Sequence, residues 1–229
     1  MTAPHAPVAE PATSLAERYA REAHAFEPRP VDAVLRGLDI LLAGGALVLA
    51  APVLALCAAL VRLSGRQVLY RGARVGRFGT TFTMYKLRTL KPGAEQRLGR
   101  HLGEELTHLT MAELTRVGAR LRRSKLDELP QLVNVLRGDM SLVGPRPIRP
   151  AFFAELCVEI PAYWQRLVVR PGLTGFAQLR LTREMTWAEK LAHDFEYIAD
   201  RSVGLYLAIL GDTAWVLVSR PPRGPVGRI

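Results

Sequence analysis

The sequence is poor in cysteine, in aromatic residues and in acidic residues. Its 229 residues include 2 cysteines, Cys57 and Cys157, which cannot form a disulfide framework and fit a reducing compartment. The 5 histidines have no ligand spacing with these cysteines, so no zinc motif is visible. No apolar stretch follows Met1 closely, which excludes a secretory signal peptide. Dinucleotide fingerprints and the elbow motif of serine or cysteine hydrolases are also missing.

The shortage of acidic residues leaves a strong positive charge. With 31 Lys and Arg against 21 Asp and Glu, the formal net charge is +10. Such a charge indicates anionic partners: nucleic acid, anionic lipid headgroups or phosphorylated substrates. Aromatic residues make up only 7% of the chain, and the basic residues gather around an apolar segment. We therefore expect no nucleic acid partner.

That apolar segment, residues 40–61, carries no charge. A straight helix of this length would cross a hydrocarbon core of about 30 Å. Pro52 near its middle favours a bend, and basic residues flank both ends although one basic flank is the rule for a crossing helix. We predict that residues 31–66 form a re-entrant membrane helix broken at Pro52, and a single crossing stays open. The flanking basic residues are Arg21, Arg29 and Arg36, then Arg62, Arg66, Arg71, Arg74 and Arg77.

The rest of the chain divides into a tail at each end and a mixed soluble domain. Residues 1–30 are predicted to be a disordered tail, residues 67–219 the cytoplasmic domain and residues 220–229 a basic tail. Residues 67–90 are predicted to form a hairpin in which alternation puts Lys86 and Arg88 on one side. Two cations on one rigid face suit a diphosphate, although a solvated strand face has the same pattern. Residues 104–123 are predicted to be helical.

Two adjacent carboxylates, Asp127 and Glu128, lie in the most informative stretch, residues 120–150. Ser124, with Asp127 three residues later, is typical of a helix N-terminus, and Pro130 is tolerated in a first turn. Carboxylates there can simply complement the helix dipole. They can also hold Mg²⁺ and supply a nucleophile for phosphoryl transfer, so both interpretations remain.

Four motifs occur in one order along the chain. They are RVGR at 74–77 with FTMYKLRT at 82–89, DELPQL at 127–132, GDMSLVGPRP at 138–147 and RPGLTGFAQ at 170–178. Together they closely resemble the bacterial sugar transferase family, the monotopic polyprenyl-phosphate phosphoglycosyl transferases. The resemblance covers about residues 34–218 and implies an α/β, helix-rich membrane-associated domain with an N-terminal re-entrant helix. The four extra N-terminal membrane helices of larger members are not seen, so the chain resembles a short form.

By this resemblance, Asp127 attacks the β-phosphate of a UDP-sugar, releases UMP and passes the sugar phosphate to polyprenyl phosphate. Glu128 would assist with Mg²⁺ or protons, so both acids are the expected metal ligands. The resemblance also places phosphate-binding residues at Arg122, Arg146 and Arg170, with Lys86 and Arg88 beside them. Glycan priming at the inner membrane, with the domain facing the cytoplasm, is the implied role.

Some features depart from the family. Leu179 to Glu184 replace a stretch that often contains Asn-Gly, and Tyr206 and Ala208 occupy positions often held by Asp and Lys. The sequence therefore does not name the sugar, and the polyprenol length and a homo-oligomer stay open. A non-catalytic membrane scaffold is the rival hypothesis, but a scaffold is expected to lose the acids or the arginines, and this chain keeps them.

Overall fold

The computed structural model describes residues 29–64, 67–98, 109–180 and 185–219. The predictions for both tails beyond these ranges, and for residues 104–108 and 181–184, lie outside the described residues. Within them, a mixed, helix-rich domain surrounds two small two-stranded sheets, which confirms the coarse fold class.

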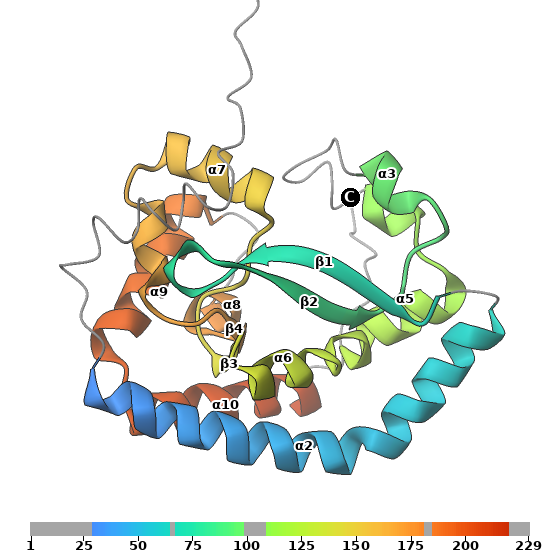
Figure 1. Cartoon of the computed structure of the whole chain (residues 1–229), viewed down its shortest axis with the longest axis horizontal. Helices are drawn as coiled ribbons and strands as arrows, with labels where there is room; N and C mark the ends of the chain where they lie inside the picture. Colours follow the sequence, from blue (N-terminus) through green and yellow to red (C-terminus); the bar gives the residue numbers. More distant parts are fainter. Residues whose placement is uncertain (1–28, 65–66, 99–108, 181–184, 220–229) are drawn as a thin grey trace, which may run out of the picture.

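Helix α2 (Pro30–Leu63) forms the base of the molecule (Figure 1). It begins with Pro30, whose fixed φ suits a first helical position, and continues through Pro52. Figure 1 shows that α2 runs beneath the domain and that its C-terminal part bends upward. The predicted bend is thus present, as curvature of one continuous helix. By length and composition α2 could cross a membrane, which suggests membrane association.

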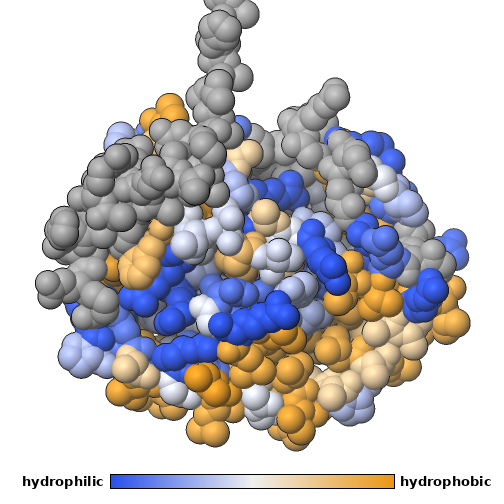
Figure 2. Space-filling model, in the orientation of Figure 1, coloured by the Kyte–Doolittle hydropathy of each residue, from blue (hydrophilic) through white to orange (hydrophobic). Residues whose placement is uncertain are grey.

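Helix α2 is buried against the domain at a few positions on both sides of Pro52, and the rest of its surface is exposed along its whole length. Leu35 and Ala43 near one end and Cys57 and Val61 near the other are buried. Exposed apolar residues of the helix are Val34, Ile40, Leu41, Leu42, Val48, Leu49, Val53, Leu56, Leu60 and Leu63. Figure 2 shows a predominantly apolar band along the lower edge, below a polar region.

Strands β1 (Leu69–Val75) and β2 (Thr81–Leu87) form the predicted antiparallel hairpin, with Tyr70 opposite Lys86. The short 3₁₀ helix η2 (Arg77–Gly79) connects them. Helix α3 (Ala94–Leu98) follows the hairpin. Gly118 of helix α5 (Arg116–Arg123) lies so close to the Thr89 backbone that a Cβ would clash, which brings α5 against the end of β2.

The segment that carries the two acids differs from its prediction. Ser124 does not begin a helix: it ends α5, and its hydroxyl donates to the carbonyls of Arg120 and Leu121. Lys125 then adopts a left-handed conformation with φ of 60°, which breaks the helix. Asp127 and Glu128 lie in the 3₁₀ helix η3 (Leu126–Glu128), just before α6 (Gln131–Arg137), as expected for residues beside a helix start. The predicted helix over 104–123 is likewise interrupted, because Thr115 caps α5 through a bond from Gly118 N.

Parallel strands β3 (Ser141–Val143) and β4 (Gly172–Thr174) pair at the centre, and the remaining helices pack around them. These helices are α7 (Pro150–Glu159), η4 (Tyr163–Val168), α8 (Phe176–Arg180), α9 (Trp187–Asp200) and α10 (Val203–Ser219). Phe153, Leu156 and Tyr163 are buried in one core cluster, so the 152–164 stretch packs into the core.

Helix α10 packs against α2. Buried Asp39 of α2 accepts hydrogen bonds from the Ser141 hydroxyl, the Leu142 amide and the Tyr206 hydroxyl, at 2.8–2.9 Å. Tyr206 therefore joins α10 to α2 through a satisfied buried carboxylate.

Candidate functional site

The two acids have unequal surroundings. Glu128 accepts a 2.6 Å charge-assisted bond from Lys86 Nζ, which comes from β2. Asp127 is 3% exposed, and its Oδ1 atom is buried without a hydrogen-bond partner. A partnerless buried carboxylate oxygen is costly, so this atom is poised to meet a cation, a proton or a reacting electrophile.

Burial and charge separate the pKa values of the two acids. Burial raises the pKa of Asp127, and the negative charge of Glu128 raises it further. Burial alone would also raise the pKa of Glu128, but Lys86, Arg146 and Lys125 outweigh it and lower that pKa to about 2. At neutral pH Glu128 is thus a firmly held anion, whereas Asp127 is the destabilised one.

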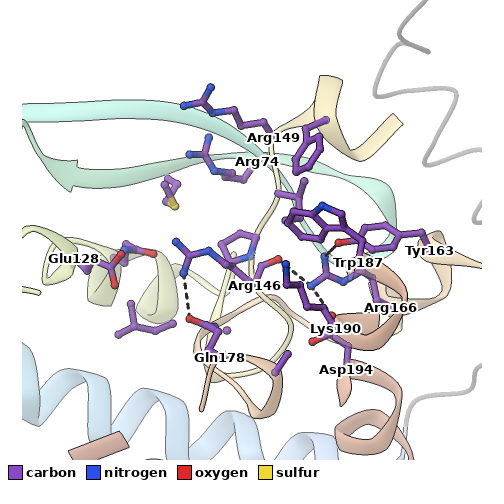
Figure 3. Close-up of a pocket in the computed structure, with 18 of the residues that line it drawn as sticks. Arg74, Glu128, Arg146, Arg149, Tyr163, Arg166, Gln178, Trp187, Lys190 and Asp194 are labelled. Carbon is purple, nitrogen blue, oxygen red and sulfur yellow. Dashed lines mark hydrogen bonds and ion pairs between the residues drawn. The ribbon is translucent and has the colours of Figure 1, made fainter. Parts of the chain in front are cut away.

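Two adjoining cavities, of about 490 and 450 Å³, meet at a shared group of cations. Glu128 lines the first cavity and Asp127 the second. The residues that line both are Arg74, Lys86, Arg146 and Arg149. Figure 3 shows Arg146 in the centre of the first cavity, with Glu128 at one end and Arg74 and Arg149 along one side. This excess of positive charge around two acids suits a substrate with several phosphate oxygens.

The structure brings most of the predicted phosphate-binding residues together. Lys86 and Arg146 line both cavities, and Arg88 and Arg122 line the second, beside Asp127. Arg170 lines neither of them. It lies next to Arg36 and Asp39 at a small separate cavity, and its Nε donates to the Gly138 carbonyl at 2.9 Å.

Sequence reasoning missed Arg74 and Arg149 as site residues. In the sequence, Arg74 is a basic flank of the apolar run and part of the RVGR motif, and Arg149 follows the GDMSLVGPRP motif by two positions. The signal available in the sequence was the position of both residues in or next to a motif: Arg74 begins RVGR, and Arg149 lies just after GDMSLVGPRP.

The end of the first cavity far from Glu128 contains an aromatic wall. Trp187 packs edge-on against Phe152 at 5.0 Å between ring centroids, and Lys190 Nζ lies 4.2 Å from the Trp187 ring. Both Trp187 and Lys190 are labelled there in Figure 3. This wall offers a flat apolar surface with a cation beside it.

Arg146 is held by its neighbours in the first cavity. Its Nη1 donates to Gln178 Oε1 at 3.2 Å, and its carbonyl accepts from Arg166 Nη2 at 3.0 Å. Arg166 itself forms a buried 2.7 Å ion pair with Asp194 of α9. The backbone of Arg146 is therefore fixed while its guanidinium faces the cavity.

The acids suit Mg²⁺ only as part of a shared site. Among the described residues no group of three or more His, Cys, Asp or Glu side chains could hold a metal. Mg²⁺ commonly binds through one or two carboxylates together with substrate phosphates and water. The partnerless Oδ1 atom of Asp127 and the neighbouring Glu128 fit that donor set.

Comparisons with known proteins agree on one family. Residues 31–220 match the family described as "Bacterial sugar transferase". The chain is 38% identical over 149 residues to a UDP-N-acetylgalactosamine-undecaprenyl-phosphate N-acetylgalactosaminephosphotransferase of Aeromonas hydrophila, an alignment that covers 64% of this chain. It is 41% identical over 152 residues, 62% of its length, to a UDP-glucose:undecaprenyl-phosphate glucose-1-phosphate transferase of Caulobacter vibrioides. A third relative, an undecaprenyl-phosphate galactose phosphotransferase of Salmonella typhimurium, is 34% identical over 168 residues, or 68% of this chain.

The matched region is only part of these relatives. It covers 34% of the Aeromonas and Salmonella proteins and 53% of the Caulobacter protein. The printed names of the three relatives also differ in the sugar that they transfer.

Proposed function

Because the chain belongs to the bacterial sugar transferase family, we propose that it transfers a sugar 1-phosphate from a UDP-sugar to a polyprenyl phosphate. The observation that carries the proposal is the partnerless, buried carboxylate oxygen of Asp127 beside cations shared by two cavities. Relatives named as undecaprenyl-phosphate sugar phosphotransferases support the same reaction class. The product would be the first lipid-linked intermediate of a glycan.

The first half of the reaction forms a covalent aspartyl intermediate. An oxygen of Asp127 attacks the β-phosphorus, the bond from that phosphorus to the bridging oxygen breaks, and UMP leaves with the electron pair. Burial and the charge of Glu128 make the ionised form of Asp127 costly. Its carboxylate is therefore reactive, because the new bond to phosphorus disperses a negative charge that the site stabilises poorly. Lys86, Arg74 and Arg146 neutralise the phosphate oxygens.

The second half restores the enzyme. A phosphate oxygen of the polyprenyl phosphate attacks the same phosphorus, the aspartyl oxygen leaves, and a polyprenyl diphosphosugar forms. One nucleophile and one set of cations then serve both anionic substrates, which predicts ping-pong kinetics. Mg²⁺, held by Asp127 and Glu128 together with substrate phosphates, would supply additional charge neutralisation.

The membrane arrangement in this proposal is re-entrant, with the catalytic domain on the cytoplasmic side. Both ends of α2 pack on the same domain, through Leu35 and Ala43 on one side of Pro52 and Cys57 and Val61 on the other. A helix that crossed the bilayer would carry one of its ends away from a domain on a single face. The exposed apolar middle of α2 supports insertion into lipid.

The test is UMP release by detergent-solubilised protein with Mg²⁺, polyprenyl phosphate and a panel of UDP-glucose, UDP-galactose and UDP-N-acetylgalactosamine. We expect release from at least one donor that depends on the lipid, and a loss of about a thousandfold or more in Asp127→Asn. Asp200→Asn, which changes an exposed carboxylate at the end of α9, is the matched control and should keep wild-type rates. Full activity in Asp127→Asn would refute the nucleophile, and no release from any donor would favour the non-catalytic scaffold.

A further inference from the structure

The two acids and helix α6 form one hydrogen-bonded unit. Glu128 N donates to Lys125 O, Leu132 N to Leu129 O and Val133 N to Pro130 O, all within 3.0–3.1 Å. The 3₁₀ turn that carries the acids therefore continues into α6 without a flexible joint. A shift of α6 would move both carboxylates with it.

One side of α6 is attached to the strand that carries Lys86. Asn134 is fully buried; its Oδ1 accepts from Tyr85 N at 3.0 Å and its Nδ2 donates to Thr83 O at 2.7 Å. These bonds fix one point of α6 relative to β2. Arg137 at the end of α6 adds a bond from its Nη1 to the Tyr85 hydroxyl of the same strand at 2.8 Å, so all of these contacts hold the side of α6 that faces β2.

The second attachment is at the C-terminal end of α6, and it comes from α2. Arg36 donates from Nη1 to Val135 O at 2.6 Å and from Nη2 to Leu136 O at 2.9 Å. Carbonyls at a helix end have no partner inside the helix and carry partial negative charge, so a guanidinium fork binds them favourably. Arg170 adds a third bond, to Gly138 O at 2.9 Å.

Packing reinforces the contact between these helices. Leu35 and Ala43 of α2 share a buried core cluster with Leu132 and Val135 of α6. Figure 1 shows α6 lying directly along α2, between it and the hairpin. The helix that carries the exposed apolar band is therefore also the platform for the helix behind the two acids.

We infer that Arg36 of α2, supported by Arg170, is a positioning residue that sets where Asp127 and Glu128 lie relative to Lys86 and Arg146. The inference rests on the proposed function. The cations that line both cavities, and that would bind the donor phosphates, come from β1, β2 and the segment after β3, not from α6. Loss of the Arg36 bonds to the end of α6 should thus misplace the nucleophile Asp127, whereas donor binding should stay largely intact. A misplacement of about 1 Å can cost about a hundredfold in rate.

The test compares Arg36→Met and Arg36→Lys with wild type. Arg123→Met is the matched control, because Arg123 is an exposed arginine of α5 that lines neither cavity. For each protein, kcat and KM for the donor are measured, together with amide hydrogen exchange of residues 126–138 in detergent. We expect Arg36→Met to lower kcat by about tenfold to a hundredfold with a donor KM within about threefold, and to speed exchange in this segment. Arg36→Lys should recover part of kcat, and Arg123→Met should match wild type.

Unchanged kcat and unchanged exchange in Arg36→Met would overturn the inference while the proposed function stood. An equal fall in every variant, the control included, would also overturn it, because the effect would not depend on the helix end. If wild type released no UMP from any donor, the proposed function would fail instead. Hydrogen exchange would still decide whether Arg36 holds α6, and unchanged exchange in Arg36→Met would reject this role of Arg36.

Discussion

At the scale of single residues, the site depends on two adjacent acids with opposite electrostatic surroundings. Glu128 is stabilised as an anion by Lys86, whereas Asp127 is buried beside that anion with one oxygen unpaired. The surroundings differ because Glu128, and not Asp127, forms the ion pair with Lys86 of β2. A pair of carboxylates in one turn thus provides one fixed charge and, in the proposed reaction, the nucleophile.

The raised pKa of Asp127 predicts that function and stability conflict at this position. A carboxyl whose folded pKa exceeds its unfolded value destabilises the native state when it is ionised, and the cost is relieved as pH falls through the folded pKa. Asp127→Asn should therefore melt at a higher temperature than wild type at pH 7.5, by on the order of 2–4 °C for each kcal/mol relieved. Thermal unfolding in detergent measures it.

The gain in melting temperature of Asp127→Asn should shrink as the pH is lowered, because Asp127 of the wild type then takes up a proton and no longer destabilises the fold. Glu128→Gln serves as the opposite case. Its lowered pKa means that the ionised form stabilises the fold at neutral pH, and that this stability is lost only as pH falls toward about 2. Glu128→Gln should melt below wild type at pH 7.5. A lower melting temperature for Asp127→Asn would contradict the assigned direction of the Asp127 shift.

At the scale of elements, α2 combines an exposed apolar surface with structural support of the domain. Its middle exposes Val48 and Leu49 at 74% and 81%, while residues on both sides of Pro52 are buried in the domain. Pro52 lacks a backbone N–H donor, so the helix bends at low cost between the buried residues Ala43 and Cys57.

This arrangement predicts that both ends of α2 lie on the same side of the membrane. Cysteines introduced as Arg29→Cys and, separately, as Ser64→Cys, with Cys57 and Cys157 replaced by Ala, should resist a membrane-impermeant thiol reagent in intact cells. Both should react after the membrane is opened. A replacement at exposed Val158 on the catalytic domain is the control for the cytoplasmic side. Labelling of one end of α2 from outside intact cells would show a crossing helix.

At the scale of the whole molecule, apolar and polar surfaces are separated. The apolar band of α2 continues onto the exposed Trp215, Leu217 and Val218 of α10, which packs beside α2. Polar side chains gather above this band in Figure 2. The net charge of +10 adds attraction to anionic headgroups, but that attraction is screened by salt, whereas apolar insertion is not.

We therefore expect the protein to stay with membranes in concentrated salt and alkaline carbonate and to be released by detergent. Leu49→Asp should weaken retention, since a carboxylate in the hydrocarbon region costs about 2.5–3.5 kcal/mol. Val158→Asp, which changes an equally apolar exposed site on α7, should have no effect. Sedimentation of membranes after each wash measures both. Release of wild type by salt alone would mean that the protein is held by charge rather than by α2.

The features that the sequence by itself determined depend on short-range patterns. A long uncharged run predicts a membrane-associated helix, alternation in 82–88 predicts a strand of the hairpin, and four ordered motifs identify the family and its two acids. Each pattern is read within one segment, where periodicity and spacing are set by local backbone geometry.

What only the tertiary structure decided is which distant side chains meet. Arg74 and Arg149 join the site and Arg170 faces the end of α6, because the hairpin, the segment after β3 and α2 converge from far apart in the sequence. Ser124 ends a helix instead of starting one, because the left-handed Lys125 turns the chain so that η3 can pack beside β2. Motifs show which residues carry charge, but the direction of a side chain follows from long-range packing, which no local spacing specifies.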